Sequence, residues 1–185
     1  MSEMIKPPRT AWGNFPDVLI HASESAVKQH PAYKAAKAGD GNAPIALVSH
    51  TMSASQNQNL AVLLEGHSPT LVSAHAGIVK PGVEYVLVDD FVGMGGTLST
   101  MKGYVESNGG KVLAAVSLTG KPHSAKLALT PERLRELRGK HGTELENWWI
   151  GQFAHTFDAL TESEARYLAR TEGADTIRDR IAAAK

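Results

Sequence analysis

Short apolar runs alternate with polar, glycine-bearing segments through the first two thirds of the chain. Four of these runs have the length of a buried strand, and the apolar spacing between them suits helices. The runs show no alternation of apolar and polar positions, which indicates burial on both faces, as in a parallel sheet. We expect strands at residues 45–48, 70–74, 85–88 and 112–118, with helices after the first and third of them.

The pattern changes after Gly120-Lys121-Pro122, beyond which the chain has the character of helices alone. Thr130 followed by Pro131 is a typical helix start, and Thr161 with Glu164 fits a capping box. The prediction is an α/β protein with a mostly parallel twisted sheet flanked by helices, a Rossmann-like core and a helical C-terminal appendage. Its parts are an N-terminal arm (1–16), the α/β core (17–121) and a helical region packed on the core (122–185).

Four aromatic residues mark this helical region. Trp148, Trp149, Phe153 and Phe157 follow spacings that place several of them on one helix face. We expect them to pack the appendage onto the sheet, and the alternative is a hood in which a planar base stacks.

Composition limits the partners and the chemistry. Among 185 residues, 19 are Lys or Arg and 19 are Asp or Glu, so the net charge of zero offers no field for nucleic acid or an anionic membrane. No cysteine is present, which excludes thiolate chemistry. The sequence shows no apolar segment suited to a secretory signal or a membrane span, so the expected location is the cytoplasm.

The segment from Asp89 to Thr97 carries the candidate chemistry. The acids Asp89 and Asp90 end the strongest apolar run, where parallel sheets bind ligands, and the turn Gly93-Met94-Gly95-Gly96-Thr97 follows them. Vicinal carboxylates can accept hydrogen bonds from sugar hydroxyls or bind Mg²⁺. Glycine-rich backbone before a helix can surround a phosphate with N–H groups. These features together predict a site for a ribose 5-phosphate ligand.

The stretch from Tyr85 to Thr97 resembles the signature of type I phosphoribosyltransferases. The resemblance implies an enzyme of nucleotide metabolism, a pentosyltransferase that transfers a phosphoribosyl group from phosphoribosyl pyrophosphate to a nucleobase-like or other acceptor and releases pyrophosphate. Asp89 and Asp90 would be the catalytic pair and would hold the ribose and Mg²⁺. The family commonly forms homodimers. The residues implied in substrate binding are Val92, Gly93, Met94, Gly95, Gly96 and Thr97 for the 5-phosphate, Ser49, His50, Thr51, Met52 and Ser53 for the pyrophosphate, and Lys80 in the catalytic loop.

Three departures from the family keep other interpretations open. Gly93 offers no carboxylate for a purine, Met94 offers no hydroxyl for the phosphate, and the loop at residues 75–84 is short for a lid. One alternative is a non-catalytic sensor of a phosphosugar or nucleotide, whose C-terminal helices bind a protein partner. Another keeps only the partner-binding role, with an empty phosphate loop.

Overall fold

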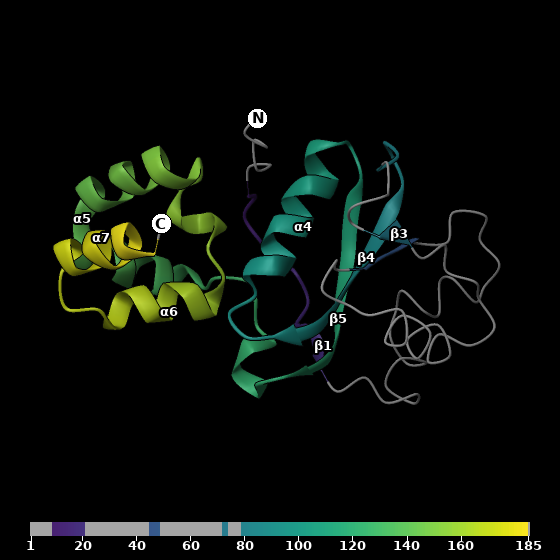
Figure 1. The fold of residues 1–185 in the computed structure, drawn as a ribbon, viewed down its shortest axis with the longest axis horizontal. Coiled ribbons are helices and arrows are strands. Elements are labelled where there is room, and N and C mark those ends of the chain that lie inside the picture. The colour runs from purple at the N-terminus through teal and green to yellow at the C-terminus, as the bar shows by residue number, and fades with distance from the viewer. Residues whose placement is uncertain (1–8, 21–44, 49–71, 74–78, 185) are drawn as a thin grey trace.

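A computed structural model describes residues 9–20, 45–48, 72–73 and 79–184. Five strands form one sheet in the order β1-β5-β4-β2-β3, and every pairing is parallel. Helix α4 (Gly96–Ser107) follows β4 and lies against the sheet (Figure 1). The predicted α/β class with a parallel sheet and flanking helices is confirmed at this level. The strands are β1 (Leu19–Ile20), β2 (Ile45–Val48), β3 (Val72–Ser73), β4 (Glu84–Val92) and β5 (Lys111–Gly120).

The central strand β4 is longer than its apolar run predicts. Asp89 and Asp90 lie within it, because β4 stays paired with β5 beyond the acids, with Phe91 opposite Thr119 and Val92 opposite Gly120. The prediction that the strand ends before the acidic pair is therefore wrong. Backbone pairing with a long neighbour extended the strand through polar residues that sequence pattern alone assigned to a loop.

The sheet and α4 enclose the first hydrophobic cluster. Leu98, Met101 and Val105 repeat at helical spacing and present one face of α4 to the strand residues. Trp12, from the described segment before β1, is buried in the same cluster and donates its indole N–H to Ser99 Oγ at 3.1 Å. Lys102 Nζ donates to the Ala11 carbonyl at 2.9 Å. These contacts fix the segment around Trp12 on α4.

After β5 the described chain forms helices beside the sheet (Figure 1). Thr130 caps α5 by accepting the Arg133 N–H, and Thr161 and Glu164 form the predicted capping box of α6. Gly142 interrupts α5 with a φ of 70°, so α5 is two helices joined at a bend. No helix in this described part combines the length and apolar character needed to cross a membrane. The elements are η1 (Pro122–Ser124), α5 (Pro131–Phe153), η2 (Phe157–Ala159), α6 (Glu162–Arg170) and α7 (Ala174–Ala183).

The helices enclose a second hydrophobic cluster, made of residues from α5, η2, α6 and α7. Trp149 belongs to this cluster, and the centroid of its ring lies 4.3 Å from that of Phe153 and 5.9 Å from that of Phe157. The rings thus pack among the helices and not on the sheet, contrary to the expectation from their spacing. Burial beside Trp149 also lowers the pKa of His155, which favours its neutral form.

Glu146 ties the two segments of α5 together across the bend. Its carboxylate accepts two hydrogen bonds of 2.8 Å from Arg138, which precedes Gly142, and one of 3.0 Å from the backbone N–H of Phe157 in η2. These hydrogen bonds, that from Arg138 first, hold the pKa of the Glu146 carboxyl below its usual range against the opposing effect of burial. The ionised form of Glu146 is therefore part of the folded helical region.

Replacing Glu146 by Gln is expected to lower the free energy of unfolding at pH 7 by about 1.5–3 kcal/mol, because a charge-assisted pair with Arg138 is lost. The folded-state pKa lies below the unfolded value of about 4.3, so this contribution is full above that pH and disappears as the pH falls through the folded pKa. Urea unfolding of both proteins from pH 7 to pH 3 measures the difference. A difference that stays constant over this range would contradict the assignment.

Gly95 should tolerate no side chain. Its φ is 84°, and an added Cβ would lie 2.5 Å from Leu127 Cδ2 and 3.0 Å from Thr161 Cγ2. We expect Gly95→Ala to cost about 2–4 kcal/mol, from left-handed strain and overpacking together. Gly139→Ala is the control, because nothing lies within 4 Å of its added Cβ in an exposed helix; it should stabilise by up to about 1 kcal/mol. Urea denaturation compares the two, and equal effects would contradict the close packing at Gly95.

Candidate binding groove

A pocket of about 300 Å³ lies where the end of β4 meets the helical region. Its walls come from three segments that are distant in sequence: the end of β4 with the following turn, the segment after β5, and one face of α6. These segments converge because α6 begins beside the turn that connects β4 to α4. The lining residues are Phe91, Gly93, Met94, Lys121, His123, Ser163, Arg166, Tyr167 and Arg170.

The α6 wall follows from the helical repeat. Ser163, Arg166, Tyr167 and Arg170 are spaced by three and four residues, so they share one face. The buried residues Ala165, Leu168 and Ala169 take the opposite face into the helical cluster. Burial of that apolar face sets the rotation of α6 and therefore directs the basic and aromatic face into the pocket.

Two contacts order the side chains of this face. Arg166 Nη2 donates to Ser163 Oγ at 3.1 Å, which holds the guanidinium along the helix. Arg180 of α7 donates from Nη1 to Tyr167 Oη at 2.7 Å, and its guanidinium lies 5.9 Å from the centre of the tyrosine ring. Tyr167 is thus fixed by a hydrogen bond and a cation–π contact while 49% of its surface stays exposed.

The pocket gathers positive charge without carboxylates. The side chains of Lys121, His123 and Arg170 make no hydrogen bond or ion pair with another residue that the structure describes, and within that part of the chain the Arg166 side chain donates only to the Ser163 hydroxyl. Outside the lining, many of the described Lys and Arg side chains are paired with acids: Arg9 with Glu164, Lys102 with Glu106, Lys111 with Glu84, Arg133 with Glu162, Arg138 with Glu146 and Arg178 with Asp175. The chain is neutral overall, but the lining of this pocket is basic.

Exposed apolar surface borders the same pocket. Phe91 is 49% and Met94 44% exposed; Phe91 lies near the end of β4, and Met94 lies on the turn that follows it. Gly93 leaves room for the Phe91 ring, whose Cε1 lies 3.0 Å from the position of an added Cβ. An apolar rim around basic side chains gives a surface that can bind a ligand with both apolar and anionic groups.

The turn itself is held by hydroxyl groups of the helical region. Ser124 Oγ donates to the Gly93 carbonyl, and Thr161 Oγ1 donates to the Met94 carbonyl at 2.5 Å. Leu127 packs over Gly95, and the N–H of Glu162 donates to the Leu127 carbonyl at 3.0 Å. The turn is therefore a structural junction between the sheet and the helices, and one wall of the pocket is rigidly placed by it.

A carboxylate of the chain lies beside the first residue of α4. Glu164 accepts two hydrogen bonds from Arg9 Nη1, at 2.9 and 3.0 Å, and its Oε1 is 3.4 Å from the position of an added Cβ on Gly96. A negative group near a helix N-terminus is electrostatically favourable. The end of α4 that the sequence assigned to a phosphate thus faces an internal ion pair.

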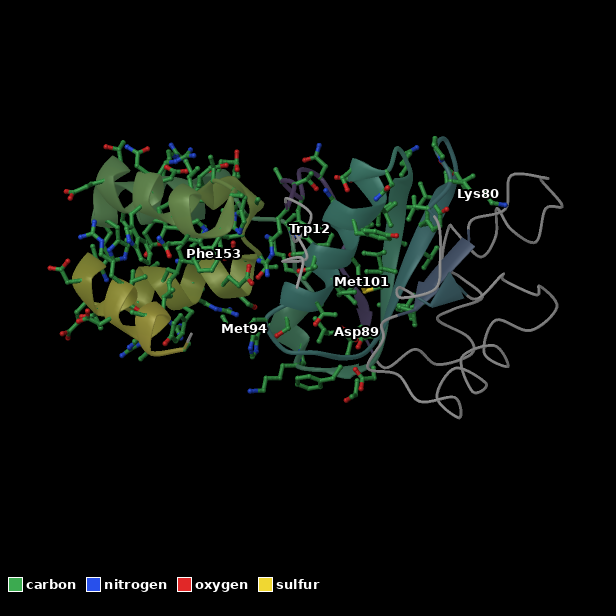
Figure 2. All side chains as sticks on the ribbon, turned by 45° about the horizontal axis from the view of Figure 1, so that its top comes forward. Trp12, Lys80, Asp89, Met94, Met101 and Phe153 are labelled. Carbon is green, nitrogen blue, oxygen red and sulfur yellow. The ribbon has the colours of Figure 1, made fainter. Side chains whose placement is uncertain are left out.

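The structure brings only part of the predicted site together. Gly93 and Met94 line the pocket, whereas Asp89 is 3% exposed and accepts the Asp90 N–H at 3.1 Å. Figure 2 shows Lys80 at the opposite end of β4 from Asp89, with its own N–H donated to Tyr85 Oη at 2.9 Å. Val92 is buried in the core, Gly95 and Gly96 pack against the helical region and Arg9, and Thr97 is exposed.

Five of the predicted site residues are not among those that the structure describes. Ser49, His50, Thr51, Met52 and Ser53 lie outside the described residues. Within the described ranges, no group of three or more His, Asp or Glu side chains is placed to hold a metal ion. Binding of Mg²⁺ by Asp89 and Asp90 stays a prediction.

The basic and aromatic residues of the pocket were missed by the sequence analysis. The repeat of Arg166, Tyr167 and Arg170 opposite the apolar Ala165, Leu168 and Ala169 was a usable signal, because a half-apolar helix directs its other face outward. No local sequence pattern indicated that Lys121 and His123 belong to the pocket. Their place beside α6 depends on how β5 ends and the chain turns, which is a tertiary property.

Comparison with known proteins gives one relative and no family model. No family model matches the chain. Protein TraN of Escherichia coli is 30% identical over an alignment of 238 residues that includes all of this chain and 53% of TraN. The chain therefore spans about half the length of that curated relative.

These comparisons overturn the assignment to the phosphoribosyltransferases. No phosphoribosyltransferase model matches, and the relative that the comparison found is Protein TraN. The expected pentosyltransferase activity and the role in nucleotide metabolism are wrong for the same reason, and a sensor on that fold gains no support. A strand, a glycine turn and a helix recur in many parallel α/β proteins. Here Leu127, Thr161 and Glu164 crowd the glycines that suggested a phosphate loop.

Thr161→Val tests the junction, with Thr130→Val as the matched control. Both changes remove a helix cap, because each hydroxyl accepts an N–H three residues later, but only Thr161 also donates to Met94. We expect Thr161→Val to destabilise by about 1 kcal/mol more than the control and to speed amide hydrogen exchange in residues 93–96. Hydrogen exchange measured by mass spectrometry compares the two variants. Equal exchange in both variants would mean that the Met94 contact does not hold the turn.

Proposed function

We propose that this chain is a binding protein whose groove, lined by the turn after β4, the segment after β5 and α6, takes an anionic group of a partner. The observation that carries the proposal is the set of basic side chains that line one pocket without an acidic partner among the described residues, in a chain whose other described cations are largely paired. Cations without an acidic partner on a concave surface attract negative charge. An anion that binds there can form charge-assisted hydrogen bonds without first displacing an acid of the protein.

The proposal requires no chemistry at the groove. The lining shows no nucleophile paired with a base, because the Ser163 hydroxyl accepts a hydrogen bond from Arg166 and no hydrogen bond joins it to His123. Such a surface positions a ligand. This agrees with the alternative in which the helical region carries a partner-binding role.

Titration with fluorescein-labelled hexaglutamate at low ionic strength tests the proposal. The double variant Arg166→Glu with Arg170→Glu should bind at least about tenfold more weakly, which corresponds to about 1.4 kcal/mol. Binding by the unchanged chain should also weaken as salt is raised, because partly exposed charges are screened. Fluorescence anisotropy gives the affinities. Backbone NMR shifts should be concentrated at residues 91–94, 121–123 and 163–170.

The control reverses two charges elsewhere. Lys111 and Arg135 are 69% and 76% exposed and are not among the residues that line the groove, so the variant Lys111→Glu with Arg135→Glu changes the net charge equally. It should retain hexaglutamate binding within about twofold, because distant exposed charges contribute little. If both double variants lose affinity to the same degree, binding reflects net charge and the groove is not the site.

A further inference from the structure

We infer that the partner taken by this groove is a short protein segment in which carboxylates flank a large apolar side chain. This inference rests on the proposed function and adds the chemical class of the occupant. Its basis is the composition of the groove, in which apolar and basic side chains line one small pocket. The apolar or aromatic groups are Phe91, Met94 and Tyr167, and the basic groups are Lys121, His123, Arg166 and Arg170.

The exposed apolar side chains of the groove, here called the apolar rim, indicate a ligand that has an apolar group as well as negative charge. Phe91, Met94 and Tyr167 are 49%, 44% and 49% exposed, and they surround the same opening from two different segments. A purely anionic ligand would leave this surface in water. Burying one large side chain against it is worth about 1.5–3 kcal/mol when complete, which is comparable to one or two charge contacts. An occupant with both characters therefore uses the whole surface.

The size and surroundings of the groove favour a short segment over an extended polyanion. A volume of about 300 Å³ accommodates one large side chain and its neighbours. Beyond Arg170 the chain exposes Glu172 and Asp179, which would repel a phosphate backbone that continued in that direction. A nucleic-acid strand binds along a continuous basic track, whereas these cations are confined to the pocket.

The groove is also built to hold a fixed shape. Hydroxyl groups of Ser124 and Thr161 hold the carbonyls of Gly93 and Met94, and Arg180 holds Tyr167. A preformed surface loses little conformational entropy on binding, so even a short segment can bind with useful affinity. The charges then fix the direction of the segment, and the apolar side chain fixes its register.

Competition among three probes tests the inference on the full chain. They are hexaglutamate, a six-residue peptide with four glutamates around a leucine–phenylalanine pair, and an eight-residue single-stranded oligothymidylate. The mixed peptide should bind at least about fivefold more tightly than hexaglutamate although it carries fewer charges, because the apolar pair is buried. The oligothymidylate should bind more weakly than either peptide. Tighter binding of the oligothymidylate would overturn the inference in favour of nucleic acid.

Variants of the rim separate this inference from the proposed function. Phe91→Ala with Met94→Ala should lower affinity for the mixed peptide about five- to tenfold, and it should lower affinity for hexaglutamate by a clearly smaller factor. Ile150→Ala, at a side chain that is 39% exposed and outside the groove lining, should change neither affinity. Failure of every anion to bind would remove the proposed function. If the two peptides bind with equal affinity, and both bind more weakly to the variant Arg166→Glu with Arg170→Glu, the proposed function stands. Only the inference of an apolar side chain in the ligand is then overturned.

Discussion

The hydroxyl of Thr161 joins the two parts of this molecule. It accepts the Glu164 N–H that starts α6 and donates its own hydrogen to the Met94 carbonyl on the turn after β4. One atom therefore sets both where α6 begins and where the turn lies. The placement of Glu164 beside Arg9 and Gly96 follows from the same start, because the capping box fixes Glu164 in the first turn of α6. The groove exists because these two positions are coupled.

The charge distribution shows how a neutral chain can present a basic surface. Equal numbers of acidic and basic residues exclude a strong field around the molecule as a whole, but they do not say which charges neutralise one another. Acids such as Glu164 and Glu146 neutralise Arg9 and Arg138, which do not line the pocket. The cations around the pocket are left as a local excess. Attraction of this kind acts over about one Debye length, roughly 8–10 Å at physiological salt.

The sequence predicted elements well where local signals decide them. The strand at residues 45–48, the caps at Thr130 and Thr161, and the parallel arrangement all depend on apolar runs and side-chain hydrogen bonds that a short window contains. The predictions from sequence failed where contacts between distant segments determine the structure. Asp89 entered a strand because β5 continued beside it, and the glycines of the turn serve packing because Leu127 and Thr161 return to them from the helical region. The groove unites three segments that no local pattern connects.

The two hydrophobic clusters share no residue, so each part of the chain buries its own apolar surface. Much of what joins the parts is polar, as in the contacts of Thr161 with Met94, Ser124 with Gly93 and Arg9 with Glu164. Water can replace hydrogen bonds of this type one at a time, while exposure of a hydrophobic core would be penalised all at once. Loss of one such contact consequently disturbs neither interior. A substitution at this junction should therefore alter the groove while both hydrophobic clusters stay packed.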